Sequence, residues 1–281
     1  MDVGAAAAAS YAPDLFAGRT VLITGGGTGI GRATAHGFAR LGGTVVIASR
    51  DEAHLAPTVD ELRGHGGEVL GVACNIRDVD SVEALLATCT DRFGGVDVLV
   101  NNAGGQFPAF PHDITDNGWR AVVDLNLNGT WNMCSRFIPP MVERGNGAVV
   151  NITHIYTFER GAPLFAHSGA ARAGVQSLTA TLGLMLGEQG VRVNGIAPGT
   201  VHTPGMEEHE SGGVSDMIDV DIFTSLKRTL PMRRFGTEDE VAAAVLFLCS
   251  PAASWITGVT LRVDGAQYQS DAPGGDAPLG W

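Results

Sequence analysis

Side chains suited to proton transfer and oxyanion binding gather in one central stretch, which carries His154, Tyr156, His167, Ser168 and Arg172. A phenol and an amine one helical turn apart, in the pattern Tyr-x-x-x-Lys, would donate a proton to a carbonyl oxygen. The chain has a single lysine, at position 227, and three tyrosines, none of them four residues before it. Serine and arginine stand at 168 and 172, so the stretch must work without such a pair.

The functional groups present define the chemistry that remains. The Tyr156 hydroxyl can hold a substrate oxygen, and Ser168 can contact the substrate or a cofactor. Arg172 keeps its charge near neutral pH, so it adds positive potential but is a poor proton relay. Two interpretations of His154 and His167 stay open: each shuttles a proton, or each makes a structural hydrogen bond.

A glycine-rich turn, Thr-Gly-Gly-Gly-Thr-Gly-Ile-Gly at 24–31, lies nearer the N-terminus. It follows a short apolar run and precedes apolar residues at helical spacing. Strand, turn and helix in this order form a cradle for a pyrophosphate, because free amides and the helix dipole favour negative charge there; a simple turn is the alternative. The contacts to a dinucleotide are expected from Gly25, Thr28, Gly29 and Ile30.

The next apolar run, 44–48, ends in Ser49 and Arg50. A hydroxyl and a guanidinium suit a ribose 2′-phosphate, where a carboxylate would suit a 2′-hydroxyl. This pair favours NADP(H) over NAD(H). In the alternative interpretation, Ser49 or Asp51 only caps the following helix and Arg50 is solvated.

Apolar runs alternate with helical patterns along the chain, which predicts an α/β fold: a Rossmann-type, doubly wound parallel sheet of about seven strands in a single domain, 18–268. A flexible leader (1–17) and a flexible tail (269–281) are expected on either side. Ligands bind at the carboxyl ends of strands in such sheets. Further cofactor contacts are therefore expected from Asn75, Ile76, Asn102, Ala103, Gly104, Pro198, Gly199, Val201 and Thr203.

The helical stretch 117–142 is apolar nearly all round, which predicts burial against the sheet and against a neighbouring subunit. Pro139 and Pro140 are expected to disrupt it near its end. Asn126 lies inside this stretch. A buried amide needs partners, so Asn126 is either a satisfied structural group or a donor to a ligand.

The segment 203–235 mixes acidic residues with methionines and other apolar residues, as in a lid over flexible apolar cargo; a surface excursion is the alternative. Its cations are candidates for the phosphates of coenzyme A, or are simply solvated. They are Lys227, Arg228, Arg233 and Arg234. Further on, Thr237 and Glu240 form the pattern of a capping box for a helix that runs to Cys249.

Composition excludes several classes of function. The net charge of −12 argues against binding to nucleic acid or to an anionic membrane surface. Four scattered cysteines and eight histidines show no metal-ligand spacing, so free buried thiols and no metal are expected. The start lacks a positively charged signal region and no apolar run is long enough for a bilayer, so we expect a cytoplasmic protein.

The glycine turn, the Asn101-Asn102-Ala103-Gly104 turn, Asn126 and Pro198-Gly199 together resemble the short-chain dehydrogenases/reductases over 16–268. More narrowly, the chain resembles peroxisomal trans-2-enoyl-CoA reductase and its bacterial relatives. The runs that carry this likeness are 46–50, 74–77, 104–107, 250–254 and, most specifically, His-Ser-Gly-Ala-Ala-Arg at 167–172. The resemblance implies a homotetramer.

A second relative, mitochondrial 2,4-dienoyl-CoA reductase, is similar at 151–153 and 155–156. In that enzyme the catalytic tyrosine directly follows the fifth strand. The resemblance therefore places the catalytic role on Tyr156, with Arg172 in the position of the family lysine, beside the nicotinamide ribose. Asn126 and Tyr156 would then hold the thioester oxygen.

Reduction of a conjugated thioester needs support for an enolate oxygen more than a proton at a carbonyl. We therefore expect an NADPH-dependent reductase of trans-2-enoyl-CoA-type thioesters. The alternatives are a 2,4-dienoyl-CoA reductase, a keto/hydroxy oxidoreductase of the same family, and a non-catalytic dinucleotide-binding protein.

Overall fold

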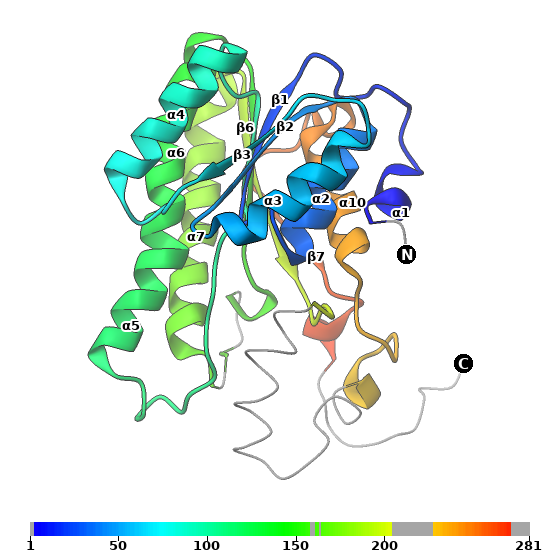
Figure 1. Cartoon of the computed structure of the whole chain (residues 1–281). Coiled ribbons are helices and arrows are strands. Elements are labelled where there is room, and N and C mark those ends of the chain that lie inside the picture. Colours follow the sequence, from blue (N-terminus) through cyan, green and yellow to red (C-terminus); the bar gives the residue numbers. More distant parts are fainter. Residues whose placement is uncertain (1–2, 158–160, 163, 204–226, 271–281) are drawn as a thin grey trace.

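The computed structural model describes residues 3–157, 161–162, 164–203 and 227–270. Its centre is a seven-stranded sheet in the order β3-β2-β1-β4-β5-β6-β7, with every neighbouring pair parallel (Figure 1). The predicted fold class is confirmed. The strands are β1 (Thr20–Thr24), β2 (Thr44–Ser49), β3 (Val69–Ala73), β4 (Val98–Asn101), β5 (Gly147–Ile152), β6 (Val191–Pro198) and β7 (Thr260–Val263).

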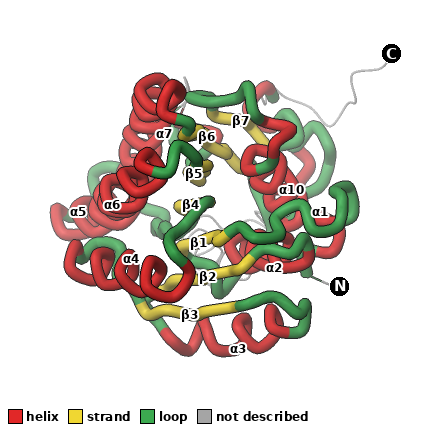
Figure 2. The backbone as a smooth tube through the Cα atoms, turned by 90° about the horizontal axis from the view of Figure 1, so that it is seen from above, coloured by secondary structure: helices red, strands yellow, loops and turns green. Residues whose placement is uncertain are grey.

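Helices cover both faces of the sheet, as Figure 2 shows from above. One face carries α4 (Val79–Phe93), α5 (Asp116–Val123), α6 (Gly129–Glu143) and α7 (Ala166–Leu186). The other carries α1 (Ala5–Ala8), α2 (Gly29–Arg40), α3 (Glu52–Arg63) and α10 (Glu238–Cys249). Strands enclosed on both sides become continuously apolar, and every residue of β1 and β5 is buried.

The order of the strands reverses between β1 and β4. From β1 the chain first builds outward through β2 and β3, and it then returns to place β4 on the other side of β1. The loops that leave β1 and β4 therefore diverge and open a crevice at the carboxyl ends of these two strands. This crevice is the expected place for a ligand.

The stretch 117–142 is not one regular helix. A five-residue π-helical turn, Asp124–Asn128, separates α5 from α6 and contains the buried Asn126. The predicted disruption at the prolines is wrong, since α6 continues through Pro139 and Pro140 to its end. The apolar side chains around them, which include Phe137 and Met141, are fully buried and hold the helix in place.

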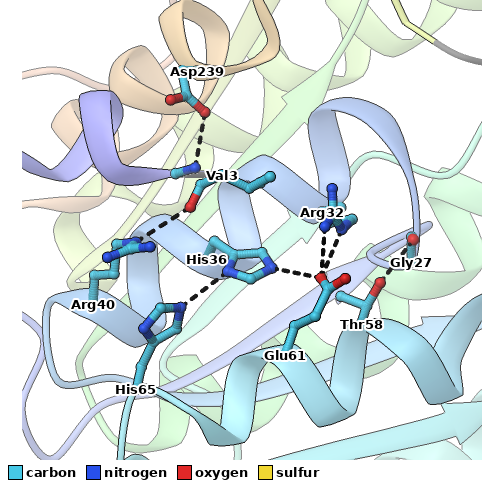
Figure 3. Close-up of polar contacts among 10 residues, drawn as sticks. Val3, Gly27, Arg32, His36, Arg40, Thr58, Glu61, His65 and Asp239 are labelled. Carbon is cyan, nitrogen blue, oxygen red and sulfur yellow. Dashed lines mark hydrogen bonds and ion pairs between the residues drawn. The ribbon is translucent and has the colours of Figure 1, made fainter. Parts of the chain in front are cut away.

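The N-terminal residues pack on the fold, in contrast to the flexible leader that was expected for 1–17. Ala7 is 1% exposed. The Gly4 amide donates to Asp239 Oδ1 at 3.0 Å, and the Tyr11 hydroxyl donates to the Ala243 carbonyl at 2.7 Å, both on α10. Arg40 of α2 donates to the Val3 carbonyl (Figure 3). The segment thus packs against both α2 and α10.

Figure 3 also shows how α3 is attached to α2 and to the glycine turn. Glu61 of α3 accepts from Arg32 at 2.7 Å and lies 3.1 Å from His36 Nε2. The Thr58 hydroxyl donates to the Gly27 carbonyl at 2.9 Å. The glycine turn is therefore held from outside by α3, in addition to the helix that it starts.

The four cysteines are free and buried, as expected. Cys249 belongs to the apolar layer under α2 and α10, whereas Cys74, Cys89 and Cys134 belong to the layer under α4 and α6. Burial raises the pKa of Cys89, Cys134 and Cys249 to about 12.

Several predicted segments lie wholly or partly outside the described residues. These are most of the proposed lid, namely 204–226, and the tail beyond residue 270.

The capping box is confirmed: Thr237 Oγ1 accepts from the Glu240 amide at 3.2 Å, and Glu240 Oε2 accepts from the Thr237 amide at 2.8 Å. Within the described part of the chain, every helix is too short or too polar to cross a membrane.

Candidate functional site

A cavity of about 460 Å³ lies where the loops after β4, β5 and β6 meet the start of α2. Nine of the residues predicted for the site line it: Ile30, Asn102, Gly104, Tyr156, Arg172, Pro198, Gly199, Val201 and Thr203. Residues that the sequence did not mark as site residues complete the wall, among them Gln106, Phe165 and Thr200. Segments distant in the sequence are thus brought together around one cavity.

The glycine turn has the backbone shape that a phosphate cradle needs. Gly25 and Gly29 adopt left-handed φ angles of 65° and 55°. A Cβ on Gly31 would lie 2.1 Å from the Gly25 carbonyl oxygen, so only glycine permits this fold of the turn. The first turn of α2 then presents backbone amides without intrahelical partners and carries no acidic residue. These features fit a pyrophosphate.

The ends of β1 and β4 are tied together by Thr24 and Asn102. Thr24 Oγ1 accepts from the amides of Asn102 and Ala103, each at 3.0 Å. The Asn102 side chain donates to the carbonyls of Thr24 and Gly25 at 3.0 and 3.1 Å. Asn102 thus fixes the glycine turn against the 102–106 loop, which is a positioning role that its predicted place at the site did not reveal.

The end of β2 keeps its suitability for a 2′-phosphate. Asp51 caps α3, because its side chain accepts from the Ala53 amide at 2.8 Å. The capping interpretation is therefore confirmed for Asp51. Ser49 and the exposed Arg50 remain beside it at the end of the strand.

Asn75 and Ile76 follow β3 and do not line the cavity. The Asn75 carbonyl oxygen of the side chain accepts from the Arg77 amide at 3.3 Å. Ile76 is buried against Gly129, where a Cβ would lie 2.7 Å from its side chain. In this arrangement both residues shape the loop after β3, and their contact with a dinucleotide stays a prediction.

Asn126 is a satisfied structural group. It is 1% exposed, and its side-chain nitrogen donates to the carbonyls of Gly105 and Val122, each at 2.8 Å. Both amide hydrogens are therefore taken by the backbone, and Asn126 cannot also hold a thioester oxygen as was expected. Its role is to anchor the 104–106 loop to the π-helical turn.

Arg172 is half-buried and packs against the same loop. Its guanidinium donates to the Ile152 carbonyl at the end of β5. A Cβ on Gly104 would lie 1.9 Å from Arg172 Nη2, so the glycine creates the space that the guanidinium fills. Burial lowers the pKa of Arg172 to about 10, and the group remains a cation at neutral pH.

Tyr156 and His154 lie directly after β5. The Tyr156 amide donates to His154 Nδ1 at 3.2 Å, and the two ring centroids are 4.9 Å apart. Burial, with the positive charge of Arg172, lowers the pKa of His154 to about 4. The imidazole is therefore neutral at pH 7 and makes the structural hydrogen bond that was one of its two interpretations.

Ser168 and His167 lie behind the cavity wall. Ser168 is 1% exposed and its hydroxyl donates to Gln106 Oε1 at 2.5 Å, which positions the Gln106 side chain. His167 Nδ1 accepts from the Ser168 amide at 2.9 Å, and its ring meets Phe107 edge to face. Neither side chain reaches the cavity, so direct contact of Ser168 with a ligand is not supported.

Gln267 is a contact that sequence reasoning missed. Its side chain is buried, and its Nε2 donates to the Tyr156 hydroxyl at 3.1 Å. It stands at the start of a 3-10 turn, Gln267–Gln269, directly after β7. A lone glutamine close to a segment expected to fray gave no signal in the sequence.

The candidate cations for coenzyme A phosphates follow the undescribed part of the lid. Arg234 is ion-paired with Glu240 at 2.6 Å and lines a second cavity of about 390 Å³, which shares Thr200 with the first. The Lys227 ammonium lies 5.0 Å from the centroid of the Phe235 ring. Arg228 and Arg233 are exposed.

Known proteins share this architecture. A family model described as enoyl-(acyl carrier protein) reductase matches residues 25–266. The chain is 34% identical over 248 residues to the 3-oxoacyl-(acyl-carrier-protein) reductase of Thermotoga maritima, covering 88% of this chain and 97% of that protein. It is 34% identical over 261 residues to a probable 2,4-dienoyl-CoA reductase of Bacillus subtilis, covering 91% and 98%. The crystal structure of an actinorhodin polyketide ketoreductase with NADPH superposes with a TM-score of 0.84 at 33% identity, over 92% of this chain and 99% of that one.

Proposed function

Because the chain belongs to the short-chain dehydrogenase/reductase family of nicotinamide-dependent oxidoreductases, we propose that it reduces the conjugated double bond of trans-2-enoyl-CoA-type thioesters with NADPH. The observation that carries the proposal is the composition of the cavity wall. Among the described residues that line it, Tyr156 provides the phenol and the half-buried Arg172 provides the permanent cation, while the helix position of the expected tyrosine is occupied by Ser168, which is buried outside the cavity.

The cofactor preference is supported by the residues at the end of β2. A hydroxyl and a guanidinium, Ser49 and Arg50, are placed there, and the neighbouring carboxylate of Asp51 is used as a helix cap. A 2′-phosphate would gain charge-assisted hydrogen bonds from Arg50. The glycine turn would bind the pyrophosphate through the first amides of α2.

The residues of the cavity suit stabilisation of an enolate. Bound reduced nicotinamide would supply a hydride to the β-carbon, and negative charge would then develop on the thioester oxygen until the α-carbon takes up a proton and completes the reduction. The Tyr156 hydroxyl can donate to that oxygen, and the positive potential of Arg172 favours the same charge. Because Asn126 is engaged with the backbone, Tyr156 is the donor that remains from the pair expected to hold the thioester oxygen.

A second candidate function is reduction of 2,4-dienoyl-CoA. Two observations favour it: Tyr156 follows the fifth strand and lines the cavity, and a relative at 34% identity is a probable 2,4-dienoyl-CoA reductase. For either thioester, the cations between Lys227 and Arg234 are the candidates for binding the phosphates of coenzyme A. A keto reductase is less well supported, because no lysine is found among the described residues that line the cavity.

A panel of substrates tests these functions directly. Purified protein would be mixed with NADPH or NADH and with enoyl-, dienoyl- or ketoacyl-CoA, while nicotinamide absorbance is followed and products are identified by mass spectrometry. We expect the fastest turnover with NADPH and an enoyl-CoA. Rapid reduction of ketones with no reduction of enoyl or dienoyl thioesters would reject the proposal, and NADPH binding without turnover on any substrate would indicate a non-catalytic protein.

The variant Tyr156→Phe tests the assigned oxyanion donor. We expect kcat on enoyl-CoA to fall roughly tenfold or more, because one preorganised hydrogen bond to the developing charge is lost. Steady-state kinetics and NADPH binding would be measured together, and Tyr268→Phe serves as the control because Tyr268 is outside the cavity lining. Equal kcat values for the wild type and Tyr156→Phe would rule out the assignment.

A further inference from the structure

The contacts of Gln267 carry an inference that rests on the proposed function of Tyr156. We propose that Gln267 is a positioning residue that makes the Tyr156 oxygen accept a hydrogen bond, and so directs the hydroxyl proton of Tyr156 into the cavity towards the substrate oxygen. Gln267 does not itself touch the substrate in this proposal. It acts through Tyr156.

Three hydrogen bonds fix the side chain of Gln267. Its Oε1 accepts from the Thr200 amide at 2.7 Å, and its Nε2 donates to Thr200 Oγ1 at 2.9 Å and to the Tyr156 hydroxyl at 3.1 Å. The side chain therefore bridges Thr200, in the loop after β6, and Tyr156, in the 3-10 turn Ile155–Thr157 that follows β5. Gln267 is 6% exposed, so water does not compete freely for these groups.

The chemistry of the partners decides which end of the amide faces Tyr156. The Thr200 backbone nitrogen can only donate, so it requires the oxygen of the Gln267 side chain. The nitrogen of that side chain must then face Tyr156, and it too can only donate. The Tyr156 oxygen is thus an acceptor in this bond, and its own hydrogen has to point elsewhere.

The backbone around Gln267 holds this arrangement. Asp264 accepts from the amides of Ala266 at 3.1 Å and Tyr268 at 2.9 Å, which sets the turn after β7. A Cβ on Gly199 would lie 2.7 Å from Gln267 Oε1, so the glycine allows the side chain to approach the loop after β6. The loops after β6 and β7 therefore fix the orientation of the Gln267 side-chain amide, so that it cannot rotate freely.

The consequence for the reaction is electrostatic. As Tyr156 shares its proton with the enolate oxygen, negative charge develops on the phenol oxygen. The Gln267 N–H already points at this oxygen and needs no reorganisation to stabilise that charge. Gln267 thus both directs the proton and supports its donation.

The variant Gln267→Glu reverses the donor and nearly preserves the shape. Its carboxylate still accepts from the Thr200 amide, but it also accepts from Tyr156 and draws the proton away from the cavity. We expect kcat on enoyl-CoA to fall roughly tenfold or more with little change in KM. Activity relative to the wild type should recover as the pH is lowered, because a protonated carboxyl group can donate again. The matched control is Gln269→Glu, an exposed residue on the same turn.

A double-variant cycle with Tyr156→Phe separates positioning from simple packing. If Gln267 acts through Tyr156, Gln267→Glu should not lower kcat further in the Tyr156→Phe background. Additive losses, or a loss that does not vary with pH, would overturn the proposal. Should Gln267→Glu fail to fold, as judged by thermal melting and NADPH binding, Gln267→Met in the same cycle gives the same decision.

A spectroscopic readout needs no substrate, so it stands even if the proposed function fails. The protein has three tyrosines, and labelling with ¹³Cζ-tyrosine gives one resonance for each. The Tyr156 resonance, identified by its absence in Tyr156→Phe, should shift in Gln267→Glu and stay in place in Gln269→Glu. An unmoved Tyr156 resonance would overturn the inference, whereas absence of enoyl-CoA reduction with a shifted resonance would overturn the proposed function alone.

Discussion

The Arg172 guanidinium occupies the space left by the missing side chain of Gly104. Adding one methyl group at Gly104 tests whether the site needs this space. A Cβ on Gly104 would lie 1.9 Å from Arg172 Nη2 and 2.6 Å from Asn126 Oδ1. Gly104→Ala must therefore displace the Arg172 guanidinium or the loop that borders the cavity. We expect kcat/KM for the thioester to fall roughly a hundredfold, in line with the effect of small misplacements on catalysis.

The neighbouring glycine provides the control for this variant. A Cβ on Gly105 would meet only Leu125, at 3.4 Å, an ordinary contact among the described residues. Gly105→Ala should keep most of its activity. Steady-state kinetics on the two variants would decide the point, and equal losses would show that the loop needs glycine for its backbone instead of for Arg172.

His154 links the site to the pH dependence of stability. Its pKa in the folded protein is lowered to about 4, by burial and by Arg172, whereas an unfolded histidine has a pKa of about 6.5. The unfolded state therefore binds the proton first as pH falls. The stability contributed is complete above the unfolded pKa and is lost progressively towards pH 4, by at most about 3 kcal/mol.

Urea unfolding between pH 7 and pH 4 measures this contribution. The free energy of unfolding should fall less steeply in His154→Leu than in the wild type. His112→Leu is the control, because the His112 side chain is 80% exposed. Parallel pH profiles for the wild type and His154→Leu would contradict the assignment.

The residues of the site were predictable to the extent that their signal is local. Gly25, Gly29 and Asn102 belong to turns whose composition follows directly from the strand before them. Asn126 was identified as a polar group in a helix, but only its two carbonyl partners show that it anchors a loop. Gln267 could not be predicted as a site residue, because its proposed role depends on a hydrogen bond to Tyr156, which lies 111 positions away in the sequence.

At the scale of elements, the N-terminal segment shows a different limit of prediction. A flexible leader was expected for this alanine-rich segment. In the folded protein, the small side chains are what allow close packing: a Cβ on Gly4 would lie 2.6 Å from the Cβ of His36. The order of this segment depends on contacts with α2 and α10, which are distant in the sequence. The capping box of α10 was predictable because its two residues, Thr237 and Glu240, are only three positions apart.

The attachment of this segment can be measured with one hydroxyl group. Tyr11→Phe removes the hydrogen bond to the Ala243 carbonyl, and we expect a loss of about 1 kcal/mol in the free energy of unfolding. Ser10→Ala, at an exposed neighbouring position, should change it little. Chemical denaturation of the three proteins would test this, and an unchanged midpoint for Tyr11→Phe would mean that the segment contributes no net stability.

At the scale of the whole molecule, the surface of α5 and α6 points to assembly. Trp119 and Trp131 on these helices are 42% and 49% exposed in the single chain. Exposed large apolar side chains on one face are typical of subunit interfaces. We propose that this face joins subunits of a homotetramer, as the family resemblance implies.

Light scattering after size-exclusion chromatography tests the assembly. The wild type should elute as a tetramer, and Trp131→Glu should shift the population to smaller species, because a carboxylate would be buried without a partner. Ala56→Glu, which adds the same charge at an exposed position of α3 on the opposite face, should remain tetrameric. A monomeric wild type, or a tetrameric Trp131→Glu, would reject this interface.

The distribution of the cysteines across the sheet has a practical consequence. With their pKa values raised by burial, these sulfurs present no reactive thiolate to an alkylating reagent until the surrounding layer opens. Cys249 lies in one layer, and Cys74, Cys89 and Cys134 lie in the other. The rate at which each cysteine is alkylated, followed by peptide mapping, would therefore report how fast its own layer opens. Cys249 would report on one side of the sheet, and the other three cysteines would report on the opposite side.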